Sequence, residues 1–171
     1  FLMTLALTGC GSADDSTDTS SLLLESILGD WVITEINDQA YPMVTSQDSI
    51  LADGSTQVLQ MVEGSKISIM GEGSAERTMR TCLRYTLNGE FDGDQSRCFA
   101  NQLGYGDTTI TDDGFIISLI DNETSEWYDL QCNQPSSDEW LCDTNGDSNS
   151  ESLTLVPGDI EALITLDYFQ D

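Results

Sequence analysis

The chain has 171 residues, with 31 acidic and five basic side chains, no histidine and a formal net charge of −26. Five bases cannot form the basic surface that nucleic-acid binding needs. Without histidine the chain cannot build a Ser-His-Asp triad, a Cys-His pair or a histidine-ligated zinc centre. A length in the range of one domain and a hydrophobic content of 39% predict a single folded domain with an acidic surface.

Residues 1–10 read Phe-Leu-Met-Thr-Leu-Ala-Leu-Thr-Gly-Cys, which is typical of the end of a secretory signal peptide. This apolar run is too short to cross ~30 Å of hydrocarbon as a helix. Its last four residues, Leu7 to Cys10, resemble the bacterial lipobox. The resemblance implies removal of residues 1–9 and attachment of lipid to Cys10, which would anchor the chain stably in a membrane. Because Gly11 follows the cysteine where an inner-membrane retention signal has Asp, it also implies the outer membrane, facing the periplasm or the exterior. The alternative is an ordinary thiol in a frayed terminus.

Residues 10–21 contain no large apolar side chain after the cysteine, so we expect a flexible acidic tether. The folded domain is expected over residues 22–171, beginning with one or two helical turns over 22–28 that Gly29 ends.

The rest of the chain alternates polar with β-branched or aromatic residues, which predicts short strands. Hairpin turns are expected around Glu63-Gly64-Ser65, at Asn88-Gly89 and at Asp112-Asp113-Gly114. Strands are expected over residues 31–37, 57–62, 66–70, 79–87, 108–111, 115–120, 126–132, 140–143, 153–156 and 162–169. The last segment could instead be a helix, because Ile160, Leu163, Ile164 and Phe169 also fit a period of about 3.6 residues.

Short strands without helical crossovers predict an all-β antiparallel meander. Closure into an up-and-down barrel would hide the sheet edges, and a β-sandwich is the alternative. Gly29-Asp30-Trp31, placed after an apolar turn and before a strand, resembles the Gly-x-Trp opening of lipocalins. That resemblance implies an eight-stranded barrel with Trp31 across its closed end; the other interpretation makes Trp31 an ordinary core residue.

Four cysteines remain after Cys10, an even number that suits disulfides in an exported chain. They permit three pairings, of which we favour Cys82–Cys98 and Cys132–Cys142 because each pair lies on adjacent segments of the meander. Free thiols would contradict the signal peptide, and a four-cysteine zinc site lacks any Cys-x-x-Cys spacing.

Two sets of residues are candidates for binding. Oxygen-bearing side chains alternate along one acidic loop in a pattern that resembles the start of an EF-hand calcium loop but does not continue it, and a solvated polar loop is the favoured interpretation. The residues of this possible calcium site are Asp143, Asn145, Asp147, Asn149 and Glu151. Inward aromatic residues of a barrel can line an apolar pocket, or they can simply form its core. The pocket candidates are Trp31, Tyr85, Trp127 and Trp140.

No nucleophile elbow or other catalytic motif is present, so we expect no enzyme activity and no required cofactor. The sequence therefore predicts an outer-membrane lipoprotein with a lipocalin-like domain that binds a small apolar molecule or serves as an envelope accessory protein. The alternative is a calcium-dependent adhesion or structural lipoprotein with a sandwich domain. The oligomeric state is left open.

Overall fold

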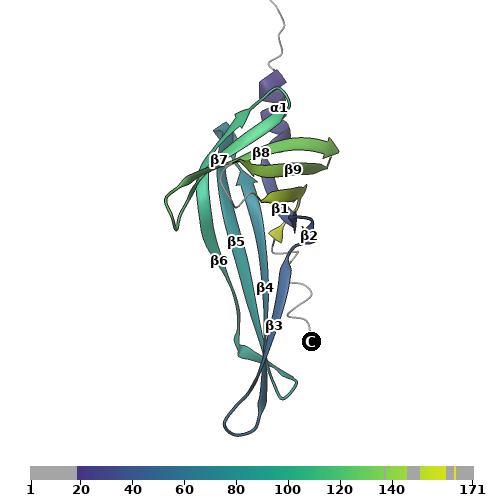
Figure 1. The fold of residues 1–171 in the computed structure, drawn as a ribbon, viewed down its shortest axis with the longest axis vertical. Helices are drawn as coiled ribbons and strands as arrows, with labels where there is room; N and C mark the ends of the chain where they lie inside the picture. Colours follow the sequence, from purple (N-terminus) through teal and green to yellow (C-terminus); the bar gives the residue numbers. More distant parts are fainter. Residues whose placement is uncertain (1–18, 137, 146–150, 161–163, 165–171) are drawn as a thin grey trace, which may run out of the picture.

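The computed structural model describes residues 19–136, 138–145, 151–160 and 164 (Figure 1). Helix α1 (Thr19–Ile27) begins three residues inside the stretch that was expected to be tether. A short 3₁₀ turn, η1, spans Gly71–Gly73. The strands are β1 (Gly29–Ile36), β2 (Gln39–Ala40), β3 (Met43–Ile50), β4 (Thr56–Ile69), β5 (Ser74–Leu87), β6 (Glu90–Ile110), β7 (Gly114–Asp121), β8 (Trp127–Ser136), β9 (Glu139–Asn145) and β10 (Ser152–Pro157).

The sheet closes into a barrel. Strands β4 to β10 pair antiparallel in chain order, and β1 pairs with both β10 and β4, which joins the two ends of the meander. Eight strands therefore form the ring, while β2 pairs with β1 and β3 with β4 outside it. This confirms the expected antiparallel up-and-down barrel and excludes the β-sandwich alternative.

Alternation along β1 divides its side chains between the barrel lumen and the exterior. Trp31 and Ile33 belong to the buried cluster inside the barrel, whereas Val32 packs in a second cluster outside it. A bulge between Ile33 and Glu35 changes this alternation, so that Glu35 is exposed and Ile36 packs against the inner cluster. The bulge keeps a charged side chain out of the lumen.

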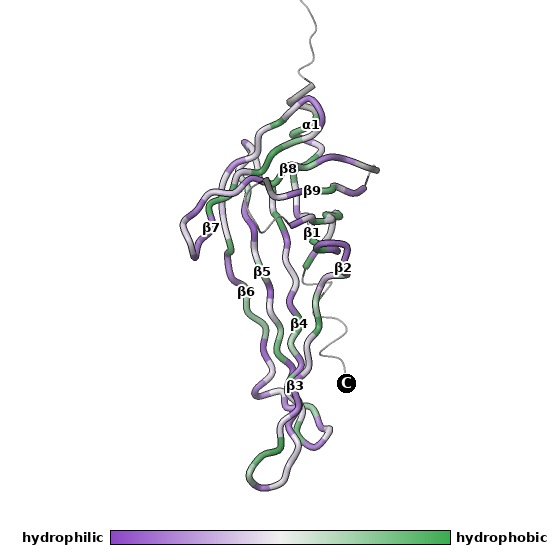
Figure 2. Tube along the Cα trace, in the orientation of Figure 1, coloured by the Kyte–Doolittle hydropathy of each residue, from purple (hydrophilic) through white to green (hydrophobic). Residues whose placement is uncertain are grey.

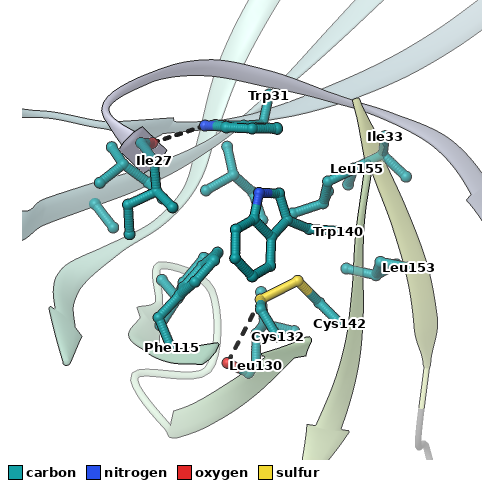
Figure 3. Close-up of a cluster of buried hydrophobic side chains, with 14 of the residues drawn as sticks. Ile27, Trp31, Ile33, Phe115, Leu130, Cys132, Trp140, Cys142, Leu153 and Leu155 are labelled. Atoms are coloured by element: carbon teal, nitrogen blue, oxygen red, sulfur yellow. Dashed lines mark hydrogen bonds between the residues drawn. A yellow bond between two sulfur atoms is a disulfide. The ribbon is translucent and has the colours of Figure 1, made fainter. Parts of the chain in front are cut away.

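The lumen is filled by side chains that come from most strands of the ring (Figure 3). Trp31 donates a hydrogen bond of 2.8 Å from its indole N–H to the carbonyl of Ile27, the last residue of α1, which fixes the helix across one end of the barrel. Trp140 meets Trp31 edge-on at 6.5 Å and Phe115 at 4.6 Å between ring centroids. Both contacts have the T-shaped geometry that aromatic pairs favour.

Four strands continue beyond the barrel as a long arm (Figure 1). We define the arm as β3, residues 56–63 of β4, 79–87 of β5 and 90–101 of β6, with their turns. The hairpin expected around Glu63-Gly64-Ser65 is wrong, because β4 runs straight through these residues and pairs with β5 along its whole length from Gln57. The small and polar residues mark the point where β4 passes from the arm into the barrel.

The end of the arm is formed by two turns. At Asn88-Gly89 both residues have positive φ, 53° and 85°, as the two-residue hairpin turn expected there requires. The Asn88 side chain accepts a hydrogen bond of 2.9 Å from the Thr56 N–H and so joins the two turns. The second turn, between β3 and β4, closes where Leu51 N–H donates to the carbonyl of Ser55 at 2.8 Å.

A second apolar cluster lies on the outer side of the sheet, where the chain leaves β10. Ile160 and Ile164 are helical and pack there with Val32, Val62 and Cys82. The strand expected over 162–169 is therefore wrong at Ile164, and the other residues of that range lie outside those described. A Cβ atom on Gly64 would collide with Ile164, which shows how closely this segment approaches β4.

Candidate functional site

The aromatic residues proposed for a pocket do not line a common cavity. Trp31 and Trp140 are 6% and 3% exposed and pack against each other in the filled lumen. Tyr85 lies on the arm, and Trp127 is 63% exposed at the start of β8. Two of the four candidates therefore form the core of the barrel, and the other two lie apart from it.

The barrel end that faces the arm is closed by a polar cluster around Arg77. Its side chain is 13% exposed, and its guanidinium lies 3.7 Å from the Glu151 carboxylate. Burial raises the pKa of Tyr128, while Arg77 opposes that shift by its charge and by a hydrogen bond to the phenol. Burial also raises the pKa of Tyr41, and the negative charge of Glu63 raises it further. Both tyrosines are therefore neutral near pH 7, and Arg77 is the cation that this end of the barrel holds.

The buried Arg77 has an energetic consequence. Its Nε atom has no hydrogen-bond acceptor among the described residues. A charged group in this position is stabilised by its partners, so loss of Glu151 would leave an uncompensated buried charge. The cluster thus closes the lumen on the arm side, as α1 closes it on the other.

The arm exposes several apolar side chains on a sheet that is open to solvent. Alternation places one set of side chains on the same side as the barrel lumen, and we call this the lumen-side face. Its large apolar members are Met43, Leu59, Met61, Met79, Leu83, Tyr85, Leu87 and Phe99. Met43, Leu87 and Phe99 are 49%, 40% and 41% exposed, and the other five are half-buried. Figure 2 shows apolar segments continuing to the far end of the arm.

The opposite side of the arm, its outer face, is covered in part. Ile160 and Ile164 pack over Val62 and Cys82 near the barrel, and the Arg84 guanidinium lies 5.1 Å from the centre of the Phe91 ring. Such a contact is a cation–π interaction. The outer face is therefore covered near the barrel and around Phe91, but Val44 and Ile50 of β3 are 48% and 80% exposed on it, so both faces of the arm carry accessible apolar side chains.

Both predicted disulfides are present. Cys82–Cys98 joins β5 to β6 in the arm, and Cys132–Cys142 joins β8 to β9 in the barrel. Each pair lies directly opposite in its antiparallel ladder, as the meander implied. The first disulfide lies under the outer apolar cluster and holds two arm strands together where the barrel no longer does.

The charged residues are divided unevenly between barrel and arm. All five bases lie on three neighbouring strands, Lys66 on β4, Arg77, Arg80 and Arg84 on β5, and Arg97 on β6. Of the 31 acids, six lie in the arm. They are Asp48, Asp53, Glu63, Glu90, Asp92 and Asp94. The arm, with three bases, is therefore close to neutral, and the barrel carries most of the negative charge.

Two predicted sites fall partly or wholly on residues that are not described. Cys10 is one of these, and so are Asp147 and Asn149 of the proposed calcium loop. Asp143 is exposed on β9, and the Glu151 carboxylate faces Arg77. Among the described residues, no three Cys, Asp or Glu side chains are grouped so that they could hold a metal ion.

Strand β3 and residues 90–107 of β6 were not predicted from the sequence. β3 carries only three large apolar residues in eight, and the signal that could have found it is the turn Asp53-Gly54 that follows it.

Comparison with known proteins adds no relative: no family model, curated protein or solved structure matches the chain. In the part of the chain that is described, no helix has the length and apolar character that crossing a membrane requires.

Proposed function

We propose that this chain is a non-enzymatic, lipid-anchored accessory protein of the cell envelope, and that it binds a partner protein through the lumen-side face of its arm. The observation that carries the proposal is the contrast between a lumen packed with side chains and an arm that leaves Met43, Leu83 and Phe99 accessible. Contiguous exposed apolar patches mark interaction sites.

Binding of a small apolar ligand inside the barrel fits the structure less well than binding at the arm. Ligand-binding barrels hold their ligand in a cavity of about 300 Å³ or more. Here Trp140, Phe115 and their neighbours occupy that space, and the polar cluster at Arg77 covers the end toward the arm. We therefore assign binding to the arm.

The position of the N-terminal helix supports an anchor. Helix α1 lies at the end of the barrel opposite the arm (Figure 1). A lipid on Cys10 would attach the protein through that end and leave the arm accessible to a partner. Metabolic labelling with an alkyne fatty acid tests this: we expect label on the native chain and none on Cys10→Ala, and unlabelled native chain would contradict the anchor.

Site-specific photo-crosslinking in intact cells tests the arm. A benzophenone amino acid at Leu83, on the lumen-side face, is expected to give one discrete adduct with an envelope protein. The matched control is Asp129, which is exposed on the outside of the barrel. Equal labelling from both positions, or none from Leu83 while Asp129 is labelled, would contradict the proposal.

Disruption of the same face gives a second readout. Leu83→Ser is expected to remove the adduct formed from a crosslinker at Met61, whereas Thr86→Ser, on the outer face of the same strand, should keep it. Near-ultraviolet circular dichroism of both variants checks that the barrel tryptophans keep their packing, so that loss of the adduct reports the arm surface rather than unfolding.

A further inference from the structure

Strand β3 is an open edge of the sheet. It pairs with β4 over eight consecutive residues, from Met43 with Glu63 to Ile50 with Thr56, without a bulge. All eight β3 residues are exposed, including Val44 at 48% and Ile50 at 80%. Natural proteins protect such edges with lysine, proline, bulges or short strands. β3 has none of these and carries a single charge, Asp48.

The other edge of the arm can be compared with β3. It is formed by residues 90–101 of β6, since β6 pairs with β7 only from Gly104 onward. This edge has an irregular register opposite Leu83 to Tyr85, and it carries Asp92, Asp94 and Arg97. One edge of the arm is therefore protected against pairing and the other is not.

The hydrogen bonds of the β3–β4 turn fix which peptide groups of β3 are available. Leu51 N–H donates to Ser55 across the turn, so in an antiparallel ladder Ser49, Gln47 and Thr45 also bond to β4. The N–H and carbonyl groups of the alternate residues then point to the open edge. These residues are Val44, Ser46, Asp48 and Ile50.

From this edge we infer that two copies of the chain pair through β3, antiparallel, about a twofold axis at Gln47. The residues whose peptide groups point to the open edge must lie opposite one another in the two copies. This condition allows only registers in which the twofold axis passes through a residue, and excludes those in which it passes between two residues. Centring on Asp48 would oppose two carboxylates, and centring on Ser46 would place Val44 opposite Asp48. Centring on Gln47 pairs Val44 with Ile50 and Ser46 with Asp48, and forms about eight backbone hydrogen bonds.

The charge of the chain favours this antiparallel arrangement over a parallel one. Parallel pairing would bring two strongly acidic barrels side by side. Antiparallel pairing overlaps the nearly neutral arms and leaves the barrels at opposite ends, separated by the length of β3, about 25 Å at ~3.3 Å per residue. That separation is well above the Debye length of ~8 Å at physiological ionic strength. The lumen-side faces of both arms then lie on the same side of one eight-stranded sheet.

A thiol at the proposed axis tests the register. In the full chain, Gln47→Cys would lie directly opposite itself in a pair without hydrogen bonds, where the two backbones approach most closely. Ser49→Cys, on the same strand and face, would lie about 14 Å from its copy. Under mild oxidation we expect a covalent dimer from Gln47→Cys at least tenfold faster than from Ser49→Cys. Cys10 contributes equally to both variants. Equal rates, or faster reaction of Ser49→Cys, would overturn the proposal.

Light scattering of the same chain tests the association itself. The dimer fraction is expected to rise with salt, because screening weakens the repulsion between the barrels. Ser46→Pro removes an N–H that faces the open edge and should give a monomer with unchanged thermal unfolding, while Ser46→Thr should still dimerise. A chain that is monomeric at every concentration and salt level would overturn the inference. The role proposed for the lumen-side face does not depend on it, because that role is read from adducts with a different protein. In this dimer the two α1 ends point in opposite directions, so only one copy would attach through α1 with its arm directed away from a given membrane.

Discussion

The barrel and the arm use the same strands in opposite ways. In the barrel, β4 and β5 bury Ile67, Ile69 and Ala75 in a lumen that is closed at both ends. A few residues further along the same strands, Met61 and Leu83 lie on an open sheet and are only half-buried. Burial of apolar surface drives folding, so the barrel supplies most of the stability and supports an arm that has little core of its own.

The largest effect that separates the two regions is expected from Trp140→Ala. Trp140 is 3% exposed and contacts Trp31 and Phe115, so its loss should lower the free energy of unfolding by about 3–5 kcal/mol. Leu83→Ala on the arm should cost about 1 kcal/mol, because a half-buried side chain removes less apolar area from water. Urea unfolding of both variants measures the difference, and equal costs would show that arm and barrel share one core.

The two disulfides should act on different regions. Each disulfide closes a short loop, and in the chain-entropy model its removal lowers the free energy of unfolding by about 3 kcal/mol. Replacing Cys132 and Cys142 by alanine should lower the melting temperature of the whole domain. Replacing Cys82 and Cys98 should mainly speed amide hydrogen exchange in the arm strands. Faster exchange spread evenly over β7 to β10 in the second variant would contradict a separate arm.

A smaller effect is expected at the junction of the two regions. Gly64→Ala places a methyl group against Ile164 and should cost about 1–3 kcal/mol through overpacking. Gly71→Ala is the control, because a Cβ at Gly71 meets no atom within 4 Å. Thermal unfolding compares the two variants. An unchanged melting temperature for Gly64→Ala would mean that Ile164 does not pack against β4.

The smallest effect concerns the ion pair between Asp30 and Lys66, whose N–O distance is 2.6 Å. The hydrogen bond from Lys66 lowers the pKa of Asp30 below its ordinary value of 3.8. Its contribution is therefore present above pH 3.8 and is lost as the pH falls through the lowered pKa. Because both side chains are partly exposed, Asp30→Asn should cost less than about 1 kcal/mol at pH 7.

The pH dependence provides the check on that pair. The difference in unfolding free energy between Asp30→Asn and the native chain should decrease as the pH falls below 3.8 toward the lowered pKa of Asp30. Asp129→Asn, which removes an exposed carboxylate on the barrel, is the control for the cost at pH 7. A cost for Asp30→Asn that stays constant as the pH falls would contradict the electrostatic explanation.

The same contrast explains what could be predicted from the sequence. Strands β7 to β10 of the barrel follow the alternation of buried and exposed residues closely, as in Phe115 to Leu119, so their positions and both cysteine pairs were predicted. The barrel parts of β5 (residues 74–78) and β6 (residues 102–107) were not predicted, whereas residues 57–62 and 79–87 of the arm were. The arm is exposed on much of both sides, so β3 has no clear apolar alternation and was missed. Gly64 looked like a turn residue, yet it is required by the approach of Ile164, a contact that sequence pattern alone does not reveal.

The candidate site was less predictable than the fold for a related reason. Trp31 and Trp140 were chosen because aromatic residues suit both a pocket and a core, and only the packing in three dimensions decides between the two. Tyr85 was the one candidate that lies on the arm's lumen-side face; its partner Leu59 lies on a predicted strand, whereas Asp92, opposite it on the other side, lies on the part of β6 that was not predicted.

The central claim, that binding belongs to the arm and not to the lumen, is tested most directly by titrating an apolar fluorescent probe into the full chain. We predict weak binding that Leu83→Ser and Met61→Ser together abolish, with no change in the fluorescence of the buried tryptophans. One-to-one binding that these arm variants leave intact, and that quenches Trp31 and Trp140, would show a ligand in the lumen and contradict the account.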